Sequence, residues 1–216
     1  MNQFTTVWGP IGLSAVLAVW FLVRFSWAGP SRAKTIVKTA SVAGLAVAAV
    51  VAEGPLWLVV ALSFGALGDF FLSREGVRPF LSGLIAFALA HLAYVLLVFS
   101  TGSPLSFGPL AVGVGVFGVV MAAVLVPRAG ALRWAVLAYV GIICAMGAGT
   151  LSLPASYATA MWAAVLFMMS DTFIGLERFV WGGTNPLRRV SPYLIWATYW
   201  AAQLLFLFAF ALERSL

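Results

Sequence analysis

Two aspartates lie inside long apolar stretches of this sequence, where an ionisable side chain is costly to bury. Asp69 follows Gly68 near the end of one apolar run, and Asp171 follows Ser170 within another. Ionisable side chains inside membrane-spanning segments usually mark a functional site. Two carboxyl groups in one site can work as an acid and a base, because one donates a proton while the other accepts one or stabilises a cation. The first hypothesis is therefore carboxylate chemistry inside a membrane.

Five further polar side chains fall in the same apolar runs and could share that site. They are Lys38, His91, Tyr94, Tyr199 and Gln203. Tyr199 and Gln203 are four residues apart, so they share one face of a helix. Counted along the expected helices, both aspartates and Lys38 lie near one membrane surface, whereas His91 lies deeper.

The same residues could instead have simpler structural roles. Either aspartate could reach the membrane surface and pair with Arg74 or Arg178, and Lys38 could extend to lipid headgroups. His91 and Tyr94 could form a hydrogen bond between helices, and Tyr199 and Gln203 could serve packing alone. These alternatives stay open at the level of sequence.

The motifs of soluble enzymes and metal centres are absent from the sequence. It contains no Gly-Xaa-Ser-Xaa-Gly elbow and no His-Glu-Xaa-Xaa-His motif, and it has a single cysteine, Cys144, and a single histidine. One histidine cannot supply a multi-histidine metal site. We assign no metal ligand and no cofactor.

The composition identifies the elements that must position these residues as membrane helices. Hydrophobic residues make up 63% of the chain and charged residues only 8%, against roughly 25% charged residues in a typical soluble domain. The mean hydropathy is +1.08. We predict an all-α polytopic bundle, a single transmembrane domain over residues 1–216 with about eight helices. The expected spans are 7–24, 35–52, 55–72, 79–99, 105–127, 132–152, 158–176 and 192–212.

Basic residues indicate how this bundle is oriented. Ten of the twelve Lys and Arg residues fall in the first, third, fifth and seventh connections, Lys38 lies just inside the second span, and Arg214 alone falls on the opposite side. By the positive-inside rule, those connections are cytoplasmic and both termini are non-cytoplasmic. The net charge of +6 then reflects topology and contact with membrane lipids, and we expect no nucleic-acid partner. Frequent Ala, Gly, Val and Arg suggest a GC-rich bacterial genome and so a bacterial inner membrane, and the sequence makes no prediction about oligomeric state.

Several short motifs together resemble the YhhN-like family of membrane proteins. In the first half they are Ala61–Leu72, Gly83–Phe87 and His91–Tyr94. In the second half they are Val136–Tyr139 with Met146, Phe167–Asp171, Glu177–Phe179, Thr198–Tyr199 and Gln203–Leu205. The motifs keep the order and approximate spacing of the family from about Lys38 to Leu205.

This resemblance implies an activity. Characterised animal members of the family are lysoplasmalogenases, which hydrolyse the vinyl ether bond of a lysoplasmalogen to a fatty aldehyde and a glycerophospho-base. The resemblance implies a lysophospholipid substrate, lysoplasmenyl-ethanolamine or lysoplasmenyl-choline, and matches Asp69 and Asp171 to the two aspartates that carry the family's chemistry. Lys38, His91, Tyr94, Tyr199 and Gln203 would then bind the substrate.

Two carboxyl groups suit this reaction. An acid protonates the β-carbon of the vinyl ether, and water captures the resulting oxocarbenium ion, much as in glycoside hydrolysis. The residues do not say which aspartate is the acid; a lysine beside one carboxylate would keep that one ionised and leave the other to donate the proton.

Other functions and substrates are open. A proton-coupled lipid or small-molecule transporter could use the same aspartates with His91 as a proton relay, and a lipid-binding protein without catalytic activity is a third possibility. Many aerobic bacteria are not expected to make plasmalogens, so a related lysolipid or another enol ether is also open as the substrate.

Overall fold

The computed structural model describes residues 3–104 and 108–213, and within them every regular element is helical. The eight α-helices of these residues are α1 Gln3–Arg24, α2 Arg32–Val51, α3 Leu56–Leu72, α4 Val77–Phe99, α5 Pro109–Leu125, α6 Arg133–Thr150, α7 Ala158–Phe179 and α8 Ser191–Leu207. A π-helical segment, Phe208–Leu212, continues α8. The predicted all-α bundle is confirmed. The first residues of the expected span 105–127, and Arg214, lie outside the described residues.

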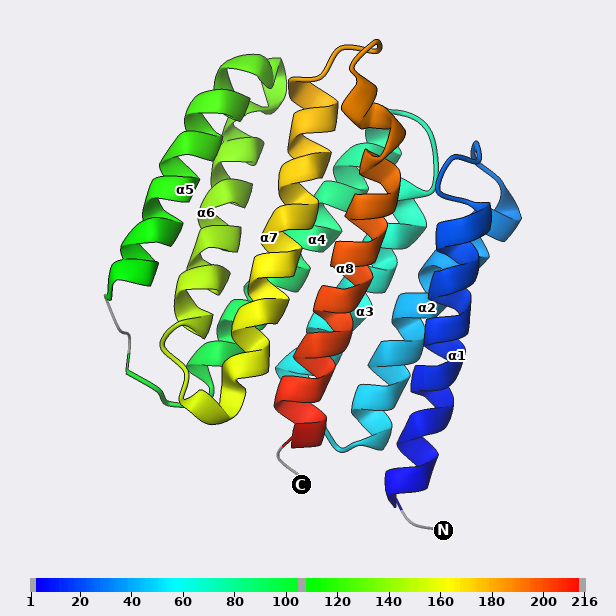
Figure 1. Ribbon diagram of the computed structural model, residues 1–216, viewed down its shortest axis with the longest axis vertical. Helices are drawn as coiled ribbons and strands as arrows, with labels where there is room; N and C mark the ends of the chain where they lie inside the picture. The colour runs from blue at the N-terminus through cyan, green and yellow to red at the C-terminus, as the bar shows by residue number, and fades with distance from the viewer. Residues whose placement is uncertain (1–2, 105–107, 214–216) are drawn as a thin grey trace.

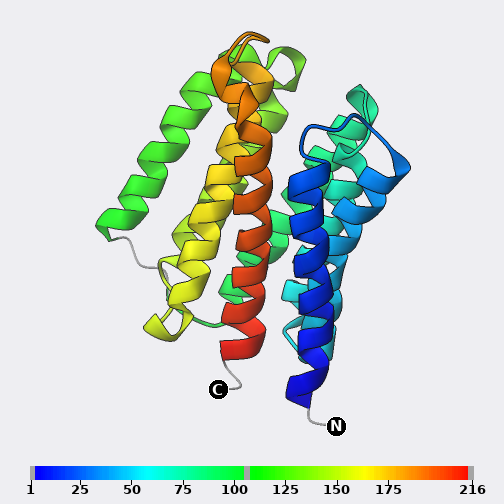
Figure 2. The same ribbon diagram turned by 45° about the vertical axis from the view of Figure 1, so that its right-hand side comes forward.

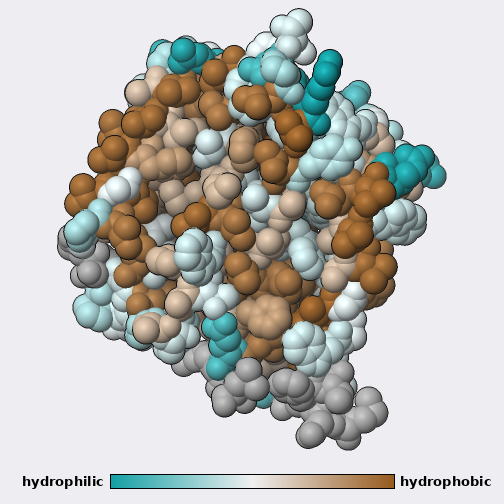
Figure 3. Space-filling view, viewed as in Figure 1, coloured by the Kyte–Doolittle hydropathy of each residue, from teal (hydrophilic) through white to brown (hydrophobic). Residues whose placement is uncertain are grey.

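The helices have the length and surface that a bilayer requires. Seven spans in the described residues are long and apolar enough to cross a membrane, whereas α3, with 17 residues, is shorter. Large apolar side chains face outward, among them Val23 (77% exposed), Val119 (71%) and Trp134 (68%). Figure 3 shows the corresponding apolar band across the middle of one face, with hydrophilic side chains gathered toward its upper end. Such a surface is stable against lipid and unstable against water, so the chain is an integral membrane protein.

The chain runs up and down through the bundle. Consecutive helices pack as antiparallel neighbours in the series α1 to α4, α4 also packs on α6, and α8 packs on α7 and touches α1, α2 and α3. Helix α5 stands at the edge of the bundle, where α6 is its main neighbour (Figures 1 and 2). Both ends of the described chain lie at the lower end in Figure 1, and the four connections that carry the basic residues lie at the upper end.

Two glycines let α3 lie close to its neighbours near the site. A Cβ atom on Gly68 would lie 2.6 Å from the ring of Phe87 on α4, and one on Gly65 would collide with the amide of Gln203 on α8. Larger residues would push α4 and α8 away from α3. The glycines therefore allow the last turn of α3, which carries Asp69, to reach the interior.

Candidate active site

Asp69 is fully buried and contacts two donors from other helices. Lys38 of α2 places its Nζ 3.1 Å from Oδ1, and the hydroxyl of Tyr199 on α8 donates to Oδ2 at 2.8 Å. The ammonium of Lys38 also lies over the rings of Phe21 and Trp196, at 5.8 Å and 5.7 Å. Lys38 thus faces a carboxylate inside the bundle instead of extending to lipid headgroups.

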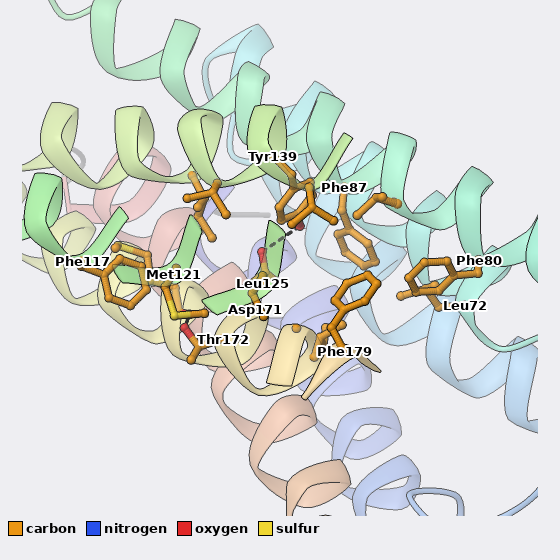
Figure 4. Close-up of a pocket in the computed structure, with 17 residues that line it drawn as sticks. Leu72, Phe80, Phe87, Phe117, Met121, Leu125, Tyr139, Asp171, Thr172 and Phe179 are labelled. Atoms are coloured by element: carbon orange, nitrogen blue, oxygen red, sulfur yellow. Dashed lines mark hydrogen bonds between the residues drawn. The ribbon is translucent and has the colours of Figure 1, made fainter. Parts of the chain in front are cut away.

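Asp171 has a different set of partners. The hydroxyl of Tyr139 on α6 donates to its Oδ2 at 2.7 Å (Figure 4), and Nε2 of His91 on α4 lies 3.4 Å from the same oxygen. His91, expected to lie deeper than the aspartates, contacts Asp171 directly. Helix α7 continues to Phe179 instead of ending at 176, so Asp171 lies further from the end of its helix than expected.

Tyr139 was not among the candidate site residues, although it touches Asp171. A signal existed in the sequence, because Tyr139 is a polar side chain within an apolar run and lies about 9 Å from the start of α6 at Arg133. Asp171 lies about 12 Å from the end of α7, and α7 ends at the same end of the bundle at which α6 begins. Comparing these two distances indicates that Tyr139 and Asp171 lie at similar depths and can be in contact.

Tyr94 and Gln203 lie behind the site. The hydroxyl of Tyr94 donates to Oε1 of Gln203, and both side chains are fully buried. Neither lines the two pockets described below. They reach the site through packing, since Phe167 lies between the rings of Tyr94 and Tyr199 at 6.2 Å and 5.4 Å.

A polar pocket contains both aspartates. The polar side chains that line it are Ser26, Lys34, Lys38, Asp69, Ser170, Asp171, Glu177 and Tyr199. Lys34 and Glu177 lie nearer the basic end of the bundle than the aspartates do, so the pocket extends from the carboxyl groups toward that end.

An apolar pocket lies next to it. Its walls come mainly from α4, α5, α6 and α7, including Phe80, Phe117, Met121, Leu125 and Phe179 (Figure 4). The two pockets share Leu72, Phe87, Asp171 and Ile174 in their linings. The polar and apolar spaces therefore meet at Asp171.

The arginines proposed as surface partners of the aspartates are engaged elsewhere. Arg74 stacks on the ring of Phe70 at 3.5 Å and donates to its carbonyl oxygen at 2.6 Å, and Arg178 lies over Phe80 at 4.5 Å. Across residues 3–104 and 108–213, no three His, Cys, Asp or Glu side chains form a group that could hold a metal ion.

The fold and these two carboxyl groups define a class, the polytopic helical membrane proteins with an intramembrane carboxylate site. Residues 33–210 match the model of the YhhN family. The chain belongs to the YhhN family. The chain is also similar to a protein of Bos taurus named lysoplasmalogenase TMEM86A, with 33% identity over 161 residues. The aligned region covers 68% of this chain and 62% of the bovine protein, so the chain spans less than two thirds of that relative. No solved structure shows a significant match.

Proposed function

We propose that this protein is a membrane-embedded hydrolase that cleaves the vinyl ether bond of lysoplasmalogens, such as lysoplasmenyl-ethanolamine or lysoplasmenyl-choline. The observation that carries the proposal is the meeting of a polar and an apolar pocket at Asp171. A lysoplasmalogen has a charged headgroup, one apolar chain and a vinyl ether bond at their junction. Membership of the YhhN family and similarity to a named lysoplasmalogenase support the same reaction.

The pockets suggest how the substrate lies. The alkenyl chain occupies the apolar pocket among α4 to α7, and the headgroup occupies the polar pocket toward the basic end. Lys34 is the best candidate to contact the phosphate, because it lines the polar pocket while Lys38 is paired with Asp69. Arg74 and Arg178 line neither this pocket nor the apolar one. The vinyl ether then lies beside Asp171.

The two carboxyl groups supply the chemistry. One donates a proton to the β-carbon, and the other stabilises the oxocarbenium ion and steers the attacking water. The hemiacetal that forms collapses to the fatty aldehyde and the glycerophospho-base.

The test is aldehyde release by the purified protein in detergent from both lysoplasmenyl lipids, beside Asp69→Asn and Asp171→Asn. We expect each variant to lose about 100-fold or more in rate, the usual scale for removing an acid or a base. Glu213→Gln, which removes an exposed acidic side chain at the end of the bundle away from the site, is the matched control and should keep wild-type activity. The saturated alkyl ether analogue should not be cleaved, since it has no double bond to protonate. A folded wild type that releases no aldehyde from either lipid would refute the proposal.

A proton-coupled lipid transporter is the second candidate. Ionisable side chains inside membrane helices also serve as proton relays, and His91 and Asp171 are two such side chains in contact. The two functions differ in what they need: a hydrolase releases aldehyde in detergent, whereas a transporter moves lipid only between two compartments in liposomes.

A further inference from the structure

The two ring nitrogens of His91 have different surroundings, and these indicate where a proton lies. Nδ1 is 2.7 Å from the backbone carbonyl oxygen of Phe87. A carbonyl oxygen only accepts hydrogen bonds, so Nδ1 carries a hydrogen and donates it. In a neutral imidazole the other nitrogen, Nε2, is then a bare acceptor.

That bare nitrogen faces another acceptor. Nε2 lies 3.4 Å from Oδ2 of Asp171, and the His91 side chain is only 1% exposed. If Asp171 were ionised beside a neutral imidazole, two acceptors would face each other with no hydrogen between them. A proton on the carboxyl group removes this conflict, because the Asp171 hydroxyl can donate to Nε2 without leaving a charge buried.

The rings around His91 favour this neutral arrangement. Its imidazole packs edge-on against Phe167 at 4.4 Å and Tyr139 at 5.4 Å between centroids. The alternative is an imidazolium paired with an ionised Asp171, which would place two charges among rings that carry none. The hydroxyl of Tyr139 is already directed to Asp171.

Asp69 is in the opposite situation. Its two oxygens face donors, the ammonium of Lys38 at 3.1 Å and the hydroxyl of Tyr199 at 2.8 Å. Donors on both oxygens match an ionised carboxylate, which is an acceptor only. The two aspartates of the polar pocket are thus arranged for different protonation states.

We propose that Asp171 is the proton donor of the site, that His91 positions its proton through Nε2, and that Asp69 is the ionised carboxylate. The role of Asp171 as the acid rests on the proposed hydrolase, whereas the position of the proton does not. His91 acts through Asp171 and is a positioning residue.

The proton balance of the reaction follows from this assignment. Asp171 transfers its proton to the β-carbon; the new C–H bond replaces the π bond, and the positive charge moves to the oxocarbenium ion. As the water oxygen adds to the cation, Asp69 accepts one of its protons. The hemiacetal hydroxyl proton passes to the leaving ether oxygen as that C–O bond breaks, which releases aldehyde and alcohol. The proton on Asp69 then returns to Asp171 through the polar pocket that both carboxyl groups line.

The chain offers a direct test, because His91 is its only histidine. Nitrogen NMR of the protein in detergent, labelled with ¹⁵N-histidine, reports on this ring alone. We expect Nδ1 to carry a hydrogen and Nε2 to appear as an unprotonated nitrogen that accepts a hydrogen bond. Asp171→Ala should move the Nε2 signal toward that of a free acceptor, and the matched variant Asp69→Ala should leave it in place.

Other spectra would overturn the proposal. A hydrogen on both nitrogens would show that Asp171 is ionised. A hydrogen on Nε2 alone would show that Nε2 cannot accept a hydrogen bond from Asp171. An Nε2 signal that moves as much in Asp69→Ala as in Asp171→Ala would also contradict it. If Asp171→Ala does not fold, the wild-type spectrum still decides, and Asp171→Asn, whose amide can donate to Nε2, should keep the wild-type nitrogen signals.

Kinetics separate the role of His91 from simple packing. His91→Phe should lower kcat by about 100-fold, the scale expected when a reacting group loses its orientation, with KM nearly unchanged. A rise in KM with kcat unchanged would assign His91 to substrate binding instead. Absence of turnover on every lipid would refute the hydrolase, while the nitrogen spectrum would still test the position of the proton.

Discussion

At the residue scale, neighbouring side chains give two identical carboxyl groups different environments. Asp69 lies against an ammonium and a hydroxyl, whereas Asp171 lies against an imidazole nitrogen and a hydroxyl. The ammonium of Lys38 is therefore expected to matter for folding as well as for chemistry, because it compensates the charge of a fully buried group.

Replacing this lysine tests that role. Lys38→Met should destabilise the protein by about 3 kcal/mol, because it leaves the Asp69 charge buried without a counter-charge. The double variant Lys38→Met with Asp69→Asn should recover most of the loss, since it removes both charges. Thermal unfolding in detergent measures the series, and additive losses in the double variant would show that the pair is not coupled.

At the element scale, α5 gives the apolar pocket one of its walls while standing at the edge of the bundle. Met121 and Leu125 face inward and are nearly buried, and Val119 on the same helix is 71% exposed. The inward face of α5 lines the pocket that we assign to the alkenyl chain. The length of chain that fits should therefore depend on this face and not on the outer one.

A matched pair of tryptophan substitutions tests this assignment. Met121→Trp should narrow the pocket and lower kcat/KM for long-chain lysoplasmenyl lipids by about tenfold, the effect of excluding about two methylenes. Short-chain substrates should be less affected. Val119→Trp adds the same indole on the lipid-facing side and should behave as wild type with both. Equal effects of the two substitutions would exclude the apolar pocket as the chain site.

At the scale of the whole molecule, the up-and-down order of eight helices in the described residues brings both ends of the chain to one end of the bundle. The basic connections lie at the other end, and the polar pocket extends toward them. If that end is cytoplasmic, as the basic residues predict, the headgroup of the substrate enters from the cytoplasmic leaflet.

Cysteine labelling checks this orientation. Because Cys144 is the only cysteine, Cys144→Ala provides a background free of thiols for single substitutions at exposed positions. With an impermeant thiol reagent on intact cells, Ser156→Cys, in the connection between α6 and α7, should react. Gly182→Cys, in the connection between α7 and α8, should react only after the membrane is opened. The reverse labelling pattern would show that the protein has the opposite orientation, with the polar pocket in the other leaflet.

The positions of the helices were predictable from the sequence alone. The span expected at 35–52 is Arg32–Val51, and the one expected at 79–99 is Val77–Phe99. Span boundaries are local properties, because each helix needs about 20 apolar residues to cross the bilayer and basic residues mark its ends. The same physics made Asp69 and Asp171 stand out, since so few ionisable groups occur inside the spans.

The partners of each polar side chain were decided only by the tertiary structure. These partners depend on which helices are neighbours and on how each helix is rotated about its axis. The rotation places Tyr139 beside Asp171 and Lys38 beside Asp69. It also places Tyr94 and Gln203 outside both pockets. A helix that is apolar on every side carries little information about the face it turns inward. That choice comes from close packing of many side chains at once, such as the fit of Gly68 against Phe87. Sequence thus determined that the chain is a membrane bundle with two carboxyl groups inside its spans, and packing alone determined that one of them meets an ammonium and the other an imidazole.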